Sequence, residues 1–331
     1  MINIDKILTE AYERCVSDVH IMIGFKPIFR IDGELLQVED FSVVNSEDMI
    51  QLIDKILTKE QKDRFNLEKE LDFSYQIKKI CRFRVNLYYE KGNICFVARV
   101  ISNKIPTLKE LLAPDIFYEI IKNKSGLILV TGPAGAGKST LIASMIEEIN
   151  KEDNRNIITI EDPIEFVYES KKSFITQRQV GEDTLSFGNA LKRVLREDPN
   201  IIVIGEMRDY ETISSAITLA ETGHLVFSTL HTISSAQTIN RIIDVFPADQ
   251  QQQIRTQLSI TLIAIISQKL VPKQYGGRVA VREVLINNSP VANLIRENRI
   301  TQIDNILQTS SQFGMFTTEQ DEKRLKQAGV I

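Results

Sequence analysis

The sequence predicts an α/β core that follows a smaller α+β domain. In the core, short and continuously apolar segments alternate with helical periodicity, which is typical of a parallel sheet covered on both faces. In the first part of the chain, helical and strand-like segments are instead combined with hairpin signals. A chain of 331 residues is long enough for two domains that each bury a core. We expect a first domain at 1–102, a linker at 103–115 and the core domain at 116–331.

The first domain is predicted to contain two helices and two hairpins. One amphipathic helix is expected near 4–15 and another over about 46–66, because apolar residues recur there at helical spacing. The strand-like segments are joined by glycine-containing dipeptides, which favour tight turns because glycine readily adopts positive φ. The strands are expected at 18–23, at 27–38 around Asp32-Gly33, at 81–90 and at 93–101, with Lys91-Gly92 between the last two.

The second part contains the segments expected to build the parallel sheet. Two prolines and a break in periodicity at 103–115 favour a linker before it. From about residue 250 helical periodicity dominates, interrupted by one strand-like stretch at 277–286. The core strands are expected at 126–130, 156–160, 200–204 and 225–229.

Composition argues against several kinds of partner. A formal net charge of -4 gives no overall attraction to nucleic acid or anionic lipid. The apolar runs are shorter than a membrane-spanning helix, and the first residues have no signal-peptide core. Cys15, Cys81 and Cys95 have no spacing suited to a disulfide framework or a four-cysteine zinc site. We expect reduced thiols, a cytoplasmic location, no membrane span and no nucleic-acid partner.

A glycine-rich segment, TGPAGAGKST at 131–140, follows the strand expected at 126–130 and opens a helix. Its G-x-x-x-x-G-K-[ST] order is that of a P-loop, in which backbone N–H groups surround the phosphates of a nucleotide. Lys138 is expected to reach the β- and γ-phosphate oxygens of ATP, and Ser139 to ligate Mg²⁺. The ATP-binding residues are expected to be Gly132, Pro133, Ala134, Gly135, Ala136, Gly137, Lys138, Ser139 and Thr140.

Acidic residues follow two other expected core strands. Glu206 comes directly after the strand at 200–204 and its glycine, where a P-loop ATPase needs a carboxylate to hold the magnesium shell or polarise the attacking water. Glu161, Asp162 and Glu165 follow an earlier core strand. Because the carboxyl ends of parallel strands meet at one edge of a sheet, both groups are expected in the ligand crevice, with Glu161 and Asp162 near the nucleotide. Surface acids that cap a strand or a solvated turn are the alternative.

Two of the three histidines, His224 and His231, flank the strand expected at 225–229. A zinc site is one interpretation, and two histidines satisfied by local hydrogen bonds are another. A strand does not present these positions as neighbours on a helical face, and the sequence offers no further ligands beside them. Zinc is therefore the disfavoured interpretation.

An ordered set of segments gives the chain a close resemblance to the type II/IV secretion ATPases, most of all to the branch that retracts type IV pili. The resemblance covers nearly the whole chain. The segments are VSDVHI at 16–21, TGPAGAGKST at 131–140, TIEDPIEFVYESKK at 159–172, LKRVLREDPNIIVIGEMRD at 191–209, ETGHLVFSTLHT at 221–232 and IDVFPAD at 243–249.

The resemblance implies a hexameric ATPase motor that powers type IV pilus retraction and twitching motility. It implies a RecA-like P-loop core with bound ATP and Mg²⁺, and a PAS-like N-terminal domain that covers the nucleotide of a neighbouring subunit. The implied partner is an inner-membrane pilus platform protein. The implied location is cytoplasmic and peripheral, at the inner face of the cytoplasmic membrane.

The resemblance also implies roles for individual residues. Glu165 and Glu206 correspond to catalytic carboxylates, and His224 and His231 to residues that sense the γ-phosphate or couple its hydrolysis to movement. In the hairpin at 81–101, alternation places two arginines on one face of a strand. The resemblance implies that this hairpin supplies arginines to the γ-phosphate of a neighbour, namely Arg82, Arg84 and Arg99.

Three alternatives remain open at this stage. A pilus-assembly or type II secretion ATPase has the same fold, and Pro290, Val291 and Ala292 depart from the retraction motif that Asn293–Glu297 keeps. The P-loop also departs from the family at Ala134 and Ala136, although backbone N–H groups make most phosphate contacts. A nucleotide-gated scaffold without turnover and a nucleic-acid translocase are the other two alternatives. Glu206 argues against the scaffold, and net acidity against the translocase.

Overall fold

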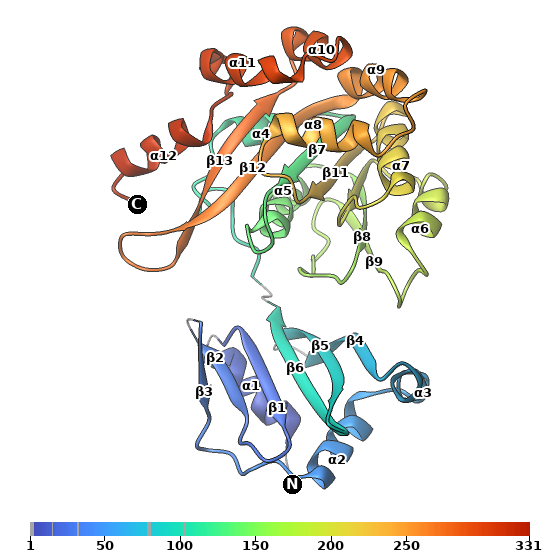
Figure 1. Ribbon diagram of the computed structural model, residues 1–331, viewed down its shortest axis with the longest axis vertical. Helices are drawn as coiled ribbons and strands as arrows, with labels where there is room; N and C mark the ends of the chain where they lie inside the picture. Colours follow the sequence, from blue (N-terminus) through green and yellow to red (C-terminus); the bar gives the residue numbers. More distant parts are fainter. Residues whose placement is uncertain (1–2, 15, 32, 78–80, 102–103) are drawn as a thin grey trace. The chain divides into compact units, whose positions relative to one another are not determined.

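The computed structural model describes residues 3–14, 16–31, 33–77, 81–101 and 104–331. The chain divides into two compact units, Met1–Lys104 and Ile105–Ile331, and each unit has its own hydrophobic core. Two residues named in the sequence-based expectations, Cys15 and Asp32, lie outside the described residues. Figure 1 labels the elements of both units.

The first unit is a six-stranded antiparallel sheet with helices packed on it. The strand order is β3-β2-β1-β6-β5-β4. Apolar residues of α1 and α2 are buried with those of the sheet, as their amphipathic spacing predicts. The elements are α1 Ile4–Glu13, β1 Asp18–Met22, β2 Ile28–Ile31, β3 Glu34–Gln37, α2 Ser46–Ile56, α3 Lys59–Glu68, β4 Glu70–Ile77, β5 Cys81–Glu90 and β6 Asn93–Ile101.

Two expectations for this unit need correction. The single helix predicted over 46–66 is two helices, because Leu57 is extended and Thr58 begins α3 with a capping box to Gln61. The strand β4 was not predicted. The turn between β5 and β6 is confirmed, with positive φ at both Lys91 and Gly92.

The second unit is built on a seven-stranded sheet with the order β13-β12-β7-β11-β10-β8-β9. Neighbouring strands are parallel except for β12 and β13. The elements are α4 Ile116–Ile120, β7 Gly126–Thr131, α5 Lys138–Glu152, β8 Asn156–Glu161, β9 Phe174–Gln179, α6 Phe187–Val194, β10 Ile201–Ile204, α7 Tyr210–Glu221, β11 Leu225–Leu230, α8 Ser235–Asp244, α9 Gln251–Thr261, β12 Leu262–Pro272, β13 Arg278–Ile286, α10 Ser289–Arg296, α11 Ile303–Thr309 and α12 Thr318–Gln327, with short 3-10 turns at Ile300–Gln302 and Ser311–Phe313.

Helices cover both faces of this sheet (Figure 1). Leu127 and Leu129 of β7 belong to a core shared with α6 to α11. Ile128 and Val130, which alternate with them, belong to a second core shared with α4 and α5. Burial on both faces explains why the core strands read as continuous apolar runs.

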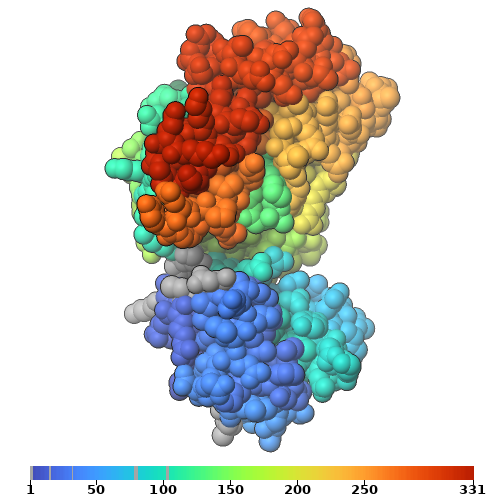
Figure 2. Space-filling view, turned by 60° about the vertical axis from the view of Figure 1, so that its left-hand side comes forward, coloured from blue at the N-terminus to red at the C-terminus, as the bar shows by residue number. Residues whose placement is uncertain are grey.

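The strand β12 contradicts the expectation that residues after about 250 are helical apart from 277–286. The helix α9 ends where Leu262 becomes extended, and β12 then pairs in parallel with β7. Most of β12 is buried on both faces, so it shows no alternation that would separate it from a helix. In Figure 2 the last residues of the chain (dark red), which include α12, lie against the β12–β13 hairpin (orange).

The segment expected to be a linker contains residues of the second unit. Leu108 is buried in the core that holds Phe117 of α4. A hydrogen bond from the Thr107 backbone N–H to Glu110 closes a local turn in the same segment. Within the described part of the chain, no helix combines the length and the apolar character needed to cross a membrane.

Candidate active site

The glycine-rich loop connects the end of β7 to the start of α5. Gly132, Gly135 and Gly137 have φ values of 142°, 74° and 80°, a region that side chains disfavour. The Nζ atom of Lys138 donates hydrogen bonds to the carbonyl oxygens of Gly132 at 2.8 Å and Pro133 at 3.1 Å. The ammonium group therefore lies over the loop at the amino end of a helix.

Two carboxylates share the surroundings of Lys138. Burial lowers the pKa of Lys138, and the negative charges of Glu206 and Glu165 oppose that shift. The structure thus brings together a lysine and two acids from three separate segments. This is the convergence expected where neighbouring parallel strands end.

Glu206 follows β10 at the same edge of the sheet. Its position is set by Thr229 at the end of β11, which donates to the Gly205 carbonyl through its hydroxyl and accepts the backbone N–H of Met207. The side chain of Glu206 is 14% exposed. One of its oxygens lies 2.6 Å from Nη2 of Arg208, and the other lies 3.4 Å from Nε2 of His231.

The two histidines occupy opposite edges of the sheet. His231 follows β11, whereas His224 precedes it, and the carbonyl of His224 accepts the N–H of Gly126 at the start of β7. At about 3.3 Å per residue, β11 separates the two histidines by roughly 20 Å. His224 therefore lies at the edge of the sheet opposite to Glu206 and His231. Its Nδ1 atom is 3.1 Å from the Leu219 carbonyl, a local hydrogen bond at the end of α7.

This separation also excludes a zinc ion shared by His224 and His231. In the described portion of the chain, no three side chains of the kinds that bind metals are grouped as a metal site would need.

The other cysteines expected to be reduced, Cys81 and Cys95, are buried and unpaired with each other. Burial raises the pKa of the Cys81 thiol to about 12.

The acidic residues at the end of β8 and after it differ in exposure, and Glu161, the last residue of β8, is half-buried. Glu161 accepts hydrogen bonds from the Thr159 hydroxyl at 2.6 Å and from Gln177 Nε2 at 3.2 Å. Burial raises the pKa of Glu161, although these bonds oppose the shift. Asp162 and Glu165 are exposed. The oxygen Oε1 of Glu161 is thus committed to protein contacts, while Asp162 and Glu165 can meet a ligand.

The chain matches the family of type II/IV secretion system proteins over residues 1–327. The chain is a type II/IV secretion ATPase. It is 43% identical over 329 residues to the type IV pilus retraction ATPase PilT of Pseudomonas aeruginosa, with 99% of this chain and 95% of the relative covered. A twitching motility protein of Neisseria gonorrhoeae is 46% identical over 306 residues, which cover 92% of this chain and 82% of the relative.

A solved structure agrees with this assignment. The pilus retraction motor PilT with bound ADP superposes with a TM-score of 0.94 at 45% identity, covering 100% of this chain and 95% of that one. The predicted fold class, a RecA-like core after a smaller α+β domain, is confirmed.

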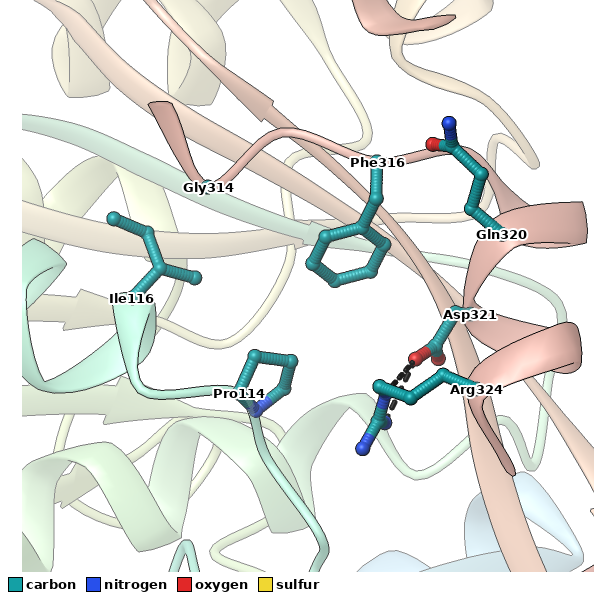
Figure 3. Close-up of a pocket in the computed structure, with 7 residues that line it drawn as sticks. All are labelled: Pro114, Ile116, Gly314, Phe316, Gln320, Asp321 and Arg324. Atoms are coloured by element: carbon teal, nitrogen blue, oxygen red, sulfur yellow. Dashed lines mark hydrogen bonds and ion pairs between the residues drawn. The ribbon is translucent and has the colours of Figure 1, made fainter. Parts of the chain in front are cut away.

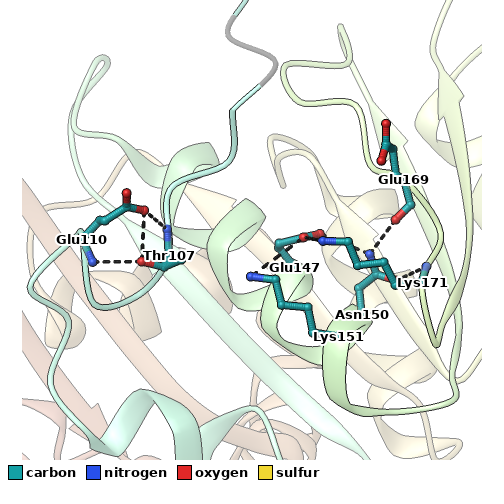
Figure 4. A network of polar contacts seen from close by, with 7 residues as sticks. All are labelled: Thr107, Glu110, Glu147, Asn150, Lys151, Glu169 and Lys171. Carbon is teal, nitrogen blue, oxygen red and sulfur yellow. Dashed lines mark hydrogen bonds and ion pairs between the residues drawn. The ribbon is translucent and has the colours of Figure 1, made fainter.

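In this secretion ATPase, α5 also holds the acidic segment in place (Figure 4). Asn150 is fully buried near the end of α5, and its Nδ2 atom donates to the Glu169 carbonyl at 2.8 Å. Its Oδ1 atom accepts the N–H of Lys171 at 2.9 Å, and Lys171 also pairs with Glu147 of α5. The helix that begins at Lys138 therefore anchors the segment that carries Glu165.

The three arginines of the first unit lie on β5 and β6. Arg84 and Arg99 are opposite each other in the ladder, so they share one face of the sheet. Arg99 donates from Nε to Asp18 at 2.8 Å, and Arg84 lies 3.9 Å from Asp72. Arg82 is on the same face of β5 as Arg84, as alternation predicts, with Cys81, Phe83 and Val85 buried on the other.

Sequence reasoning missed two residues that contact this site. Arg208 pairs with Glu206, and its place two residues later in GEMRD was an available signal. Gln268 of β12 donates from Nε2 to the Ala136 carbonyl of the loop at 2.7 Å. Gln268 was not predicted. The segment around it was interpreted as helical, so nothing placed it beside the loop.

Proposed function

We propose that this chain is a hexameric motor that hydrolyses ATP to power type IV pilus retraction. One observation carries the proposal: the likeness to the P. aeruginosa retraction ATPase runs through nearly the full length of both chains. The meeting of Lys138, Glu206 and His231 at one sheet edge supports the ATPase part.

The loop from Gly132 to Thr140 binds the phosphates of ATP in this proposal. Its N–H groups surround them, and Lys138 exchanges its bonds to loop carbonyls for bonds to phosphate oxygens. Glu206 accepts a proton from the attacking water. Arg208 and His231, each beside one oxygen of Glu206, hold that carboxylate in a fixed orientation. Glu165, Glu161 and Asp162 line the crevice beside them.

The residues at this edge fit a magnesium ion. Ser139, in the first turn of α5, offers a hydroxyl oxygen, and Glu206 offers a carboxylate that binds directly or through water. Oxygen donors of this kind are those that Mg²⁺ prefers. When bound with ATP, the ion neutralises charge on the phosphates.

The first unit is proposed to complete the site of a neighbouring subunit. Arg82, Arg84 and Arg99 share a polar face of its sheet, and a guanidinium can bond two phosphate oxygens at once. In this proposal residues 1–102 are a PAS-like domain and 116–331 the motor core, and 103–115 connect them while adding Leu108 to the packing of the core. The ring acts on a pilus platform protein at the inner face of the cytoplasmic membrane.

A pilus-assembly or secretion ATPase is the second candidate. The observation that favours it is the amino end of α10, where Pro290, Val291 and Ala292 stand in place of the first part of the retraction motif.

Deleting the gene and imaging the cells decides between these candidates. Non-motile cells with excess pili support retraction, whereas cells without pili support assembly. Re-expressing Glu206→Gln tests the scaffold alternative in the same strain. If this variant restores motility, turnover is unnecessary and the motor proposal fails.

A further inference from the structure

One residue of β12, Gln268, contacts the P-loop without belonging to it. β12 pairs with β7 as far as Ser267 opposite Thr131, and the next residues are Gln268 and Gly132. A Cβ atom on Gly132 would lie 2.1 Å from the Gln268 carbonyl oxygen, which leaves room only for glycine. The side chain of Gln268 meanwhile reaches the Ala136 carbonyl at the other end of the loop. Gln268 therefore contacts the loop where it begins and where it ends.

The bond to Ala136 fixes the direction of a peptide group. In a trans peptide, the carbonyl and the N–H that follows it point in opposite directions. Because the Ala136 carbonyl faces Gln268, the N–H of Gly137 faces away from β12. P-loops bind phosphate through backbone N–H groups that converge on one side. Gln268 thus orients one of the donors that this loop offers.

The amide of Gln268 is itself oriented by Arg282. The two residues are directly opposite in the antiparallel pair of β12 and β13. Arg282 is 1% exposed, and its Nε–H donates to Oε1 of Gln268 at 3.3 Å. A reversed amide would turn its N–H groups toward this donor and its oxygen toward the Ala136 carbonyl. Arg282 therefore selects the orientation in which Nε2 faces the loop.

Arg282 is held in turn by the C-terminal part of the chain. Its backbone N–H donates to Asp321 of α12 at 2.8 Å, and its Nη2 donates to the Leu111 carbonyl at 3.1 Å. Asp321 is buried and also pairs with Arg324 at 2.7 Å, and both residues line a pocket together with Phe316 (Figure 3). A continuous set of buried polar contacts thus links α12 to the P-loop.

We infer that Gln268 is a positioning residue of the nucleotide site and that Arg282 keeps its amide in the working orientation. The inference rests on the proposed binding of ATP by the P-loop. A phosphate contact to Gly137 is present both in bound ATP and in the transition state. Its loss therefore raises Kd and KM while leaving kcat nearly unchanged.

The test replaces Gln268 with methionine, which has similar length, carries no charge and cannot donate to Ala136. We expect Kd for a fluorescent ATP analogue and KM for ATP to rise about tenfold, with kcat within about threefold of wild type. Asn287→Leu is the matched control. Asn287 is an amide that donates to the carbonyls of Ser259 and Leu262 at the far end of β12. The Kd of the Asn287→Leu variant for the ATP analogue is expected to stay within about twofold of wild type.

Arg282→Met provides a second, independent variant. It keeps the donor of Gln268 but frees the amide to rotate, so a smaller rise in Kd, about threefold, is expected. If Gln268→Met does not fold, the Kd of Arg282→Met for the ATP analogue decides whether the inference stands. An unchanged Kd in the folded variants, or an equal rise in Asn287→Leu, would overturn the inference.

Lys138→Ala separates this inference from the proposed function. If Lys138→Ala loses ATP binding while Gln268→Met keeps it, only the positioning role is wrong. If Lys138→Ala binds ATP normally, the P-loop assignment and the inference both fail.

Discussion

Nε2 of His231 lies 3.4 Å from Oε2 of Glu206, at the ends of two adjacent parallel strands. The other oxygen of Glu206 lies 2.6 Å from Arg208, so each carboxylate oxygen has a cationic or hydrogen-bonding neighbour. This arrangement leaves Glu206 with little rotational freedom beside Lys138.

Replacing Glu206 with glutamine is expected to separate binding from hydrolysis. The amide keeps the shape of the side chain but cannot accept the proton of the attacking water. We expect ATP to bind while hydrolysis falls by about 10²-fold or more. Steady-state ATPase assays and nucleotide titration measure the two effects. Glu221→Gln, on the C-terminal turn of α7, is the control and should keep its rate. Turnover of Glu206→Gln within threefold of wild type would contradict the assignment.

The two histidines are expected to behave differently when replaced by alanine. His231→Ala removes a neighbour of Glu206, so ATP turnover should fall about tenfold. His224→Ala removes only a hydrogen bond at the opposite edge, so turnover should stay within about threefold, with a loss of about 1 kcal/mol in stability. Equal losses of turnover in the two variants would refute this distinction. Elemental analysis of wild type should find no stoichiometric zinc.

Arginines supplied by a neighbour should make hydrolysis recoverable in mixed rings. The Arg82→Ala, Arg84→Ala double variant is mixed with Glu206→Gln, and each variant is expected to lose most of its ATPase activity by itself. Arg99 is kept because it pairs with Asp18, which is 7% exposed and would lose a charged partner. Some interfaces then combine an intact core with intact arginines, so ATPase activity should partly return. No recovery despite subunit mixing shown by native mass spectrometry would count against sharing, as would a monomer with the full rate.

Glu161 is expected to make stability depend on pH. Burial raises its pKa, so the folded state keeps a proton that the unfolded state has lost. The stabilising contribution is complete below the ordinary pKa and is lost as the pH rises through the raised value. Glu161→Gln should therefore show a smaller fall in Tm than wild type as the pH rises above the ordinary pKa of a glutamate, about 4.3. Glu182→Gln, an exposed control, should follow wild type. Identical pH profiles for Glu161→Gln and wild type would rule out this role.

The sequence predicted the core strands because burial on both faces leaves them continuously apolar. The same property concealed β12, which directly follows α9 and has no alternation to mark its start. The break between α2 and α3 was readable, since Thr58 and Gln61 have the spacing of a capping box. Strand β4 lies directly after α3, so the prediction that overlooked the break between α2 and α3 also overlooked β4.

For the site, position in the sequence placed Glu206 and His231 at strand ends, and the structure brings them together. His224 precedes its strand and so lies at the other edge, although the resemblance groups it with His231. Gln268 could not be predicted, because its importance comes from a strand pairing that only the three-dimensional sheet establishes.

The distance along the chain between β7 and β12 has a consequence for synthesis. Thr131 and Ser267, whose hydroxyls are hydrogen-bonded, are 136 residues apart in the sequence. A ribosome that has released the glycine-rich loop must still make most of the sheet that surrounds it. Contacts of such long range form late during folding. The nascent chain is therefore expected to gain affinity for ATP only after β12 has left the exit tunnel, so ATP cannot assist the earlier steps of folding.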